Sequence, residues 1–109
     1  MPRHEFGIMQ QPPLPGRRYD EYEPEKYACI TVDDAYIEPL LPRLVGIGCY
    51  WHTLDVPGEG LAYCGVTLIP PGALDAFLAV IDGADGLDEL RRLMLYARAA
   101  GSFMIHFGI

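Results

Sequence analysis

The stretch IGCYWHTLDVPGEGLAYCGVTL, residues 47–68, decides the predicted fold. Its two ends, 47–54 and 61–68, are rich in β-branched and aromatic residues, a composition typical of strands. Between them, Pro57 and Gly58 suit the two central positions of a type II turn. The stretch therefore predicts a β-hairpin.

The polarity of the facing residues indicates the register of this hairpin. A symmetric pairing about the loop sets apolar residues against each other on one face: Ile47 against Leu68, Cys49 against Val66 and Trp51 against Cys64. The other face receives Tyr50 against Gly65 and His52 against Tyr63. A slip of one residue would exchange the two faces, so we expect Trp51 on the core side and the tyrosines on the outer side.

Strands are also predicted on both sides of the hairpin. The run YACITV, residues 27–32, precedes it, and SFMIHFGI, residues 102–109, ends the chain. A helix is expected between the first strand and the hairpin, from Pro39 to Gly46, because proline at the first helical position removes no hydrogen bond.

Two amphipathic helices are expected between the hairpin and the last strand. Their apolar residues recur at helical spacing, at Leu74, Phe77, Leu78 and Ile81 in the first helix and at Leu87, Leu90, Met94 and Ala97 in the second. Gly83 and Gly101 suit the ends of these helices.

The order strand, helix, hairpin, two helices, strand resembles a ferredoxin-like split βαβ arrangement with an extra helix. The predicted fold class is α+β, with a four-stranded antiparallel sheet in the order 4-1-3-2 and helices on one face. Residues 1–26 are rich in Pro, Tyr and Glu, and we interpret them as an extended N-terminal arm. Residues 27–109 are then a single domain, as the length of 109 residues suggests.

Charge and composition exclude several classes of partner. The formal net charge is -7, and eight basic residues dispersed along the chain make no basic face for nucleic acid. No stretch approaches the length of about 18 apolar residues that a membrane span needs, so we expect no membrane partner. Three cysteines without CxxC spacing fit reduced thiols, and the expected location is the cytoplasm.

The predicted outer face carries an unusual group of side chains. Strict alternation along the strands sends aromatic, histidine and cysteine residues to this face: Tyr27, Cys29, Tyr50, His52, Tyr63 and His106. Water covers their large apolar bodies poorly, so we expect this face to be covered. The cover is a second copy of the protein, the N-terminal arm or a small-molecule ligand.

Metal and thiol chemistry are weaker readings of the same residues. In the predicted order, His52 and His106 lie on opposite edge strands, about 14 Å apart at about 4.8 Å per strand, too far to share one zinc ion. Cys29 lies beside the strand of His106, but no nucleophile motif accompanies it. We therefore expect no metal site and no cofactor.

Three functional hypotheses remain open. The leading one is a non-enzymatic interaction or ligand-binding module that forms a homodimer or other homo-oligomer through the Tyr and His face. The second is a small enzyme or metabolite-binding protein that uses His52 and Tyr63 near the 55–60 loop. The third is an acidic inhibitor or immunity-type partner of a basic protein.

Overall fold

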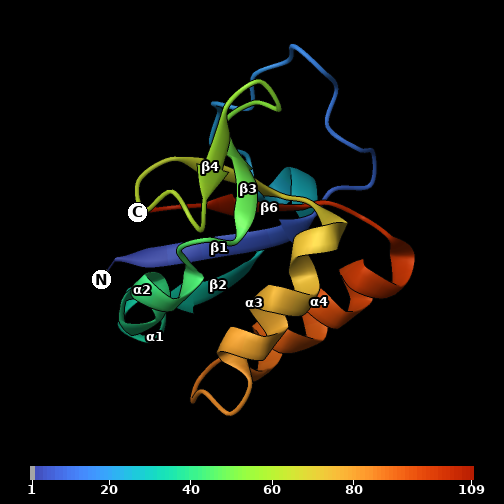
Figure 1. Cartoon of the computed structure of the whole chain (residues 1–109). Coiled ribbons are helices and arrows are strands. Elements are labelled where there is room, and N and C mark those ends of the chain that lie inside the picture. Colours follow the sequence, from blue (N-terminus) through green and yellow to red (C-terminus); the bar gives the residue numbers. More distant parts are fainter. Residues whose placement is uncertain (1) are drawn as a thin grey trace.

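The computed structural model describes residues 2–109 and contains one antiparallel sheet of six strands (Figure 1). The strand order is β2-β1-β6-β5-β3-β4. The strands are Arg3–Ile8 (β1), Ile30–Asp33 (β2), Gly48–Trp51 (β3), Pro57–Glu59 (β4), Val66–Ile69 (β5) and Met104–Phe107 (β6). The helical segments are Pro24–Tyr27 (η1), Asp34–Ile37 (α1), Glu38–Leu40 (η2), Leu41–Leu44 (α2), Pro71–Ala73 (η3), Leu74–Ile81 (α3) and Asp88–Ala100 (α4).

The α+β class is confirmed, but the four-stranded sheet and its 4-1-3-2 order are wrong. β1 lies within the segment that was expected to be an arm outside the sheet, and it pairs with β2 on one side and β6 on the other. Its side chains alternate as a strand requires, with His4 and Phe6 fully buried on the helix face. Gly7 obscures this pattern, yet it is needed, because a Cβ there would lie 2.8 Å from the Cys29 sulfur.

The predicted hairpin register is also wrong. Leu68 pairs with Tyr50 instead of Ile47, an offset of three residues (50 − 47), and an odd offset turns the side chains of β5 to the opposite faces. The cause is β4. The loop itself forms this short edge strand, which pairs with the edge of β3 that lies away from β5. Gly58 permits this pairing, since a Cβ there would lie 2.4 Å from the Trp51 indole.

The inversion of β5 is passed on to β6. Val66 pairs with Phe107 and Thr67 pairs with His106, so neighbouring residues share a face across the two strands. Thr67 and His106 consequently lie on the helix face. Phe107 lies on the opposite face, which we call the outer face.

The helical segment after β2 begins earlier than predicted. Asp33 caps α1 by accepting a 2.8 Å hydrogen bond from the Ala35 N–H, and the chain then continues through η2 and α2. The two later amphipathic helices are confirmed as α3 and α4. They cover the helix face of the sheet, and their predicted apolar residues are buried in its core.

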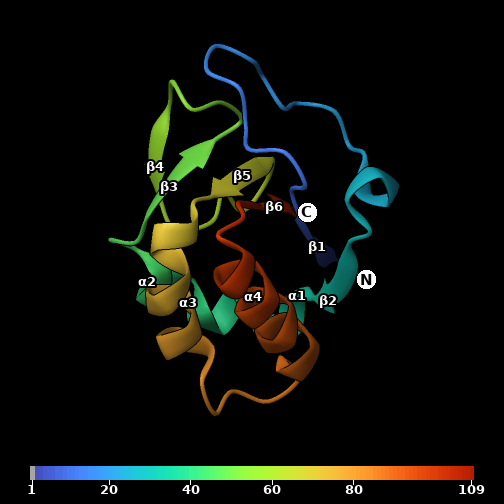
Figure 2. The same ribbon diagram turned by 90° about the vertical axis from the view of Figure 1, so that its right-hand side faces the viewer.

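A covering segment, residues 10–29, lies over the outer face (Figure 2). In Figure 2 it arches above β5 and β6, while α3 and α4 lie on the other side of the sheet. The outer face holds a smaller apolar cluster, formed by Met9, Val66, Leu68, Ile105 and Phe107. Tyr19 and Tyr27 of the covering segment pack against this cluster. The structure thus has three layers: the helices α3 and α4, the sheet, and the covering segment.

The central place of β1 is testable by truncating its buried ring. Phe6→Ala removes a fully buried aromatic side chain, and we expect it to lower the free energy of unfolding by about 3–5 kcal/mol. Val45→Ala, at a residue that is 64% exposed, is the control, with a change within about 0.5 kcal/mol. Urea titrations of both variants give the comparison. Equal, small effects would mean that residues 3–8 lie outside the folded sheet.

Candidate functional site

The six predicted site residues lie in three places. Tyr27, Cys29 and Tyr50 pack against the apolar cluster of the outer face. Tyr63 and His106 lie instead in a polar network on the helix side. His52 contacts the covering segment, where its Nδ1 lies 2.8 Å from an Asp20 carboxylate oxygen without the geometry of a hydrogen bond.

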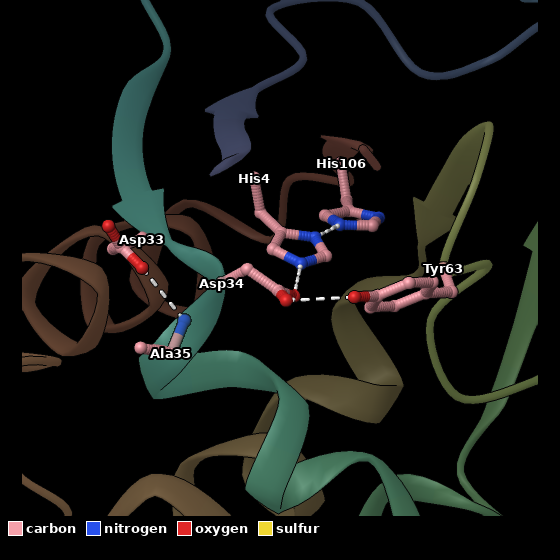
Figure 3. A network of polar contacts seen from close by, with 6 residues as sticks. All are labelled: His4, Asp33, Asp34, Ala35, Tyr63 and His106. Carbon is pink, nitrogen blue, oxygen red and sulfur yellow. Dashed lines mark hydrogen bonds and ion pairs between the residues drawn. The ribbon is translucent and has the colours of Figure 1, made fainter. Parts of the chain in front are cut away.

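The polar network joins two histidines, an aspartate and a tyrosine (Figure 3). His4 lies at its centre, with Nδ1 2.8 Å from His106 Nε2 and Nε2 2.7 Å from Asp34 Oδ1. The Tyr63 hydroxyl donates a 2.8 Å hydrogen bond to the other oxygen, Asp34 Oδ2. His106 Nδ1 lies 3.3 Å from Thr67 Oγ1, so the contacts continue into the interior.

Four separate parts of the chain bring these side chains together. His4 comes from β1, His106 from β6 and Asp34 from the first turn of α1, while Tyr63 lies in the loop before β5. Both histidines are fully buried, whereas Tyr63 is 36% exposed. The network therefore runs from a surface tyrosine to the inside of the protein.

Sequence reasoning missed His4 and Asp34. The available signal for His4 was the alternation of His4, Phe6 and Ile8 with Arg3 and Glu5, which is the period of a strand. Asp33 and Asp34 were read together as a turn and cap. Asp33 does cap α1, but no sequence pattern shows that the next carboxylate meets a histidine 30 residues away.

The contacts shift the pKa values of the network in directions that fit its hydrogen bonds. The hydrogen bond with His4 is the main cause that lowers the pKa of Asp34, so this group is a carboxylate. Its acceptance of the Tyr63 hydroxyl proton raises the pKa of Tyr63 to about 12. Burial, with a further contribution from the charge of His4, lowers the pKa of His106 well below its ordinary value.

Backbone bonds hold the network in place at both chain ends. The Asp34 N–H donates to the Pro2 carbonyl at 3.1 Å, which ties α1 to the start of β1. After β6, the Ile109 N–H donates to the Tyr63 carbonyl at 3.0 Å. Gly108 allows this approach, because a Cβ there would lie 2.2 Å from the same carbonyl oxygen.

Cys29 and His106 do not form a reactive pair, because they lie on opposite faces of the sheet. Burial raises the pKa of the Cys29 thiol to about 12, which favours the unreactive protonated form. Across residues 2–109, the structure contains no group of three or more His, Cys, Asp and Glu residues that could hold a metal ion.

A cavity of about 350 Å³ is formed by residues of the covering segment together with Met9. Its lining is mostly apolar, and two cations stand at its side, Arg17 and Lys26. Each cation lies over a tyrosine ring, Arg17 at 5.2 Å from the centre of Tyr19 and Lys26 at 5.6 Å from the centre of Tyr27. We call this space the apolar cavity; its other lining residues are Met9, Gln10, Gln11, Pro12 and Leu14.

A second space, the polar cavity, adjoins the first. It has a volume of about 290 Å³ and shares the two cations and the two tyrosines with the apolar cavity. Its remaining lining residues are Arg18, Asp20, Glu21, Glu23 and Ile105. Arg18 and Asp20 form an ion pair at 2.7 Å, whereas, within residues 2–109, Arg17 and Lys26 form none.

The covering segment is attached to the sheet at several points. The Tyr22 hydroxyl donates to the buried Glu5 carboxylate of β1. The Tyr19 N–H donates to the His52 carbonyl at 2.7 Å. His52 has a φ of 66°, in the left-handed region that side chains disfavour, so this attachment stores backbone strain.

The buried state of His106 predicts a loss of stability in mild acid. In the unfolded chain a histidine protonates below about pH 6.5, whereas His106 stays neutral in the folded protein, so only the unfolded state gains this proton. This loss is absent above about pH 6.5. Below that pH the free energy of unfolding falls by about 1.4 kcal/mol per pH unit. Urea titrations at pH values between about 7.5 and 5 measure this slope.

Asp34 does not disturb this measurement, because its lowered pKa affects stability only as the pH falls below about 3.8. In His106→Gln the slope between about pH 6.5 and 5 should be smaller by one proton. If that variant does not fold, an NMR titration of the wild-type His106 ring replaces it. A stability that is level across this range would contradict the prediction.

Comparisons with known proteins add no relative to this description. No family model matches the chain, and neither does any curated protein or solved structure. Among the helices of residues 2–109, none has the length and apolar character that crossing a membrane requires.

Proposed function

We propose that this protein is a non-enzymatic ligand-binding module that takes a small amphipathic anion under its covering segment. The observation that carries the proposal is the junction of an apolar and a polar cavity at Arg17 and Lys26. A ligand with its apolar body in the first cavity would bring its charged group to this junction. Ligand sites are commonly concave and apolar with a few polar groups, and volumes begin at about 300 Å³.

The apolar cavity suits the body of such a ligand. Met9, Pro12 and Leu14 contribute aliphatic surface, and Tyr19 and Tyr27 contribute ring faces. Leu14 is a large apolar side chain that is 55% exposed and that a bound ligand would cover. Burial of apolar surface contributes about 25 cal/mol per Å², so the body of the ligand supplies much of the binding free energy.

Two cations at the junction, Arg17 and Lys26, favour an anion. The polar cavity is lined by three of the eight basic residues of the chain, Arg17, Arg18 and Lys26, and by the acidic residues Asp20, Glu21 and Glu23. Asp20 is already neutralised by Arg18, while the other two cations lie over tyrosine rings and form no ion pair within residues 2–109. Charge-assisted hydrogen bonds from Arg17 and Lys26 to a carboxylate or similar group are therefore available.

The attachments of the covering segment support a preformed site. Tyr22 is fixed to Glu5, and the backbone of Tyr19 is fixed to His52. A site that is already ordered loses less conformational entropy when a ligand binds. Neither cavity is lined by His4, Asp34 or Tyr63, so the proposal assigns the polar network no contact with this ligand.

The test uses three probes with the same chain and different head groups: octanoate, octanol and octylamine. Calorimetric titration of the full chain should give the tightest binding for octanoate, then octanol, then octylamine, because only the anion meets Arg17 and Lys26 as counter-charges. Tightest binding of the amine would refute the anion preference. Absence of binding by all three probes would refute a ligand site for small amphiphiles.

A charge-matched pair of double variants locates the site. Arg17→Met with Lys26→Met should weaken octanoate binding by about tenfold or more, since each charge-assisted hydrogen bond contributes about 1.5–3 kcal/mol. Arg91→Met with Arg92→Met changes the net charge equally on exposed positions of α4 and should leave the affinity unchanged. Equal weakening in both variants would show a general effect of charge, not a site under the covering segment.

A further inference from the structure

We propose that His4 and His106 form a one-proton switch, in which His106 changes its tautomer but not its charge when His4 is protonated. This inference is independent of ligand binding under the covering segment. It rests on the serial contacts from Asp34 through His4 and His106 to Thr67, which leave each ring nitrogen with one partner.

The first state of the network has both histidines neutral. Because Asp34 is a carboxylate and can only accept, His4 Nε2 carries the hydrogen and donates it to Asp34 Oδ1. His4 Nδ1 is then an acceptor, and His106 Nε2–H donates to it across 2.8 Å. His106 Nδ1 accepts in turn from the Thr67 hydroxyl.

The second state contains one more proton, located on His4. The His4 imidazolium donates from Nε2 to Asp34 and from Nδ1 to His106 Nε2. His106 has now become the opposite neutral tautomer, and its Nδ1–H donates to Thr67 Oγ1. That oxygen has two lone pairs, so it still accepts the Ala62 N–H at 2.8 Å. All contacts between the side chains persist. The bonds of His106 to His4 and to Thr67 reverse their direction, and the two bonds to Asp34 keep theirs.

The pair takes up only one additional proton, because a second additional proton would have no place. The two rings are stacked with centres 5.1 Å apart, and both are fully buried. Two imidazolium ions at this distance would repel each other and would each lose hydration. The single charge belongs on His4, since of the two histidines only His4 contacts the carboxylate of Asp34.

Few other groups around His4 could take up the proton instead of it. From α1, Asp34 faces His4; from β6, His106 does; and from the loop before β5, the Tyr63 ring lies 5.7 Å away. On β2, the paired residue Val32 is apolar. Glu38 and Cys64 act on Tyr63, the exposed end of the network.

The consequence is a pH-sensitive element that carries information inward without carrying charge inward. Uptake of a proton at His4 reverses the donor and acceptor roles of His106. The Thr67 hydroxyl then accepts a hydrogen bond from His106 and no longer donates one to it. The change thus reaches β5, two strands away from β1 in the sheet. Only the first step alters a charge, and that charge stays paired with Asp34.

The test is an NMR titration of the imidazole ring nitrogens of the full chain, from about pH 8 to about pH 5. Ring-nitrogen shifts distinguish protonated from unprotonated nitrogens and therefore identify charge state and tautomer separately. We expect His106 to carry its hydrogen on Nε2 at high pH and on Nδ1 at low pH, and to remain neutral throughout. The reversal should follow the protonation of His4 with the same midpoint.

Two neighbouring aspartates provide a matched pair of variants. Asp34→Asn removes the carboxylate that holds the charged His4, so the reversal should move to lower pH or leave the range. Asp33→Asn changes the adjacent carboxylate, which turns away from the network toward Ala35 (Figure 3), and should leave the midpoint unchanged. Asparagine remains a suitable helix cap at that position.

Three outcomes overturn the proposal. One is formation of an imidazolium at His106 within the range, and another is a His106 tautomer that stays the same while His4 is protonated. The third is a midpoint that shifts equally in the two variants, which would assign the effect to general charge. If Asp34→Asn does not fold, the wild-type tautomers alone decide between these outcomes and the proposed one.

Discussion

The contact between His4 and Asp34 is the constraint on which the rest of the sheet depends. The imidazole and the carboxylate are both buried, and they bond to each other at 2.7 Å. They must stay together, because either one alone would be a buried polar group without a partner. The contact fixes β1 to α1, and α1 follows directly from β2. It therefore helps to hold the first strand in the sheet, where β1 pairs with β2 and β6.

The sheet has two differently covered faces, and this difference explains how so short a chain serves both. On the helix face, α3 and α4 supply a large apolar core. The outer face has no helix of comparable length and is covered by residues 10–29, which pack with tyrosines on a smaller cluster. A cover made of irregular chain fills space less completely than a helix, and both cavities are lined mainly by its residues.

Sequence patterns predicted the parts of the fold that depend on local periodicity. The apolar spacing of Leu74, Phe77, Leu78 and Ile81 is a property of one helix, and the structure confirms it as α3. Register was less accessible, because the pairing of β3 with β5 depends on β4, whose residues Pro57 and Gly58 have the composition of a turn. The error of three residues there reversed the expected faces of β5.

The polar network was inaccessible for a different reason. His106 was identified as a candidate residue, but it was assigned to the outer face because the apolar residues that alternate with it along β6 were expected on the helix face. His4 was hidden by its place in a Pro-rich segment, and Asp34 by a neighbour that performs the expected capping role. Hydrogen bonds between residues as far apart as 102 positions leave no periodic trace in a single sequence.

The pairing of β1 with β6 also has a consequence for how the protein is made. These neighbours in the middle of the sheet are the first and the last strands along the chain, so a ribosome produces one long before the other. Until β6 emerges, β1 has one unpaired edge and His4 lacks His106. Long-range strand pairing of this kind folds slowly and exposes unpaired edges to other chains. During synthesis, β1 must therefore remain without its β6 partner. Two of its side chains, Arg3 and Glu5, are charged, and charged residues discourage a strand from pairing with a wrong partner.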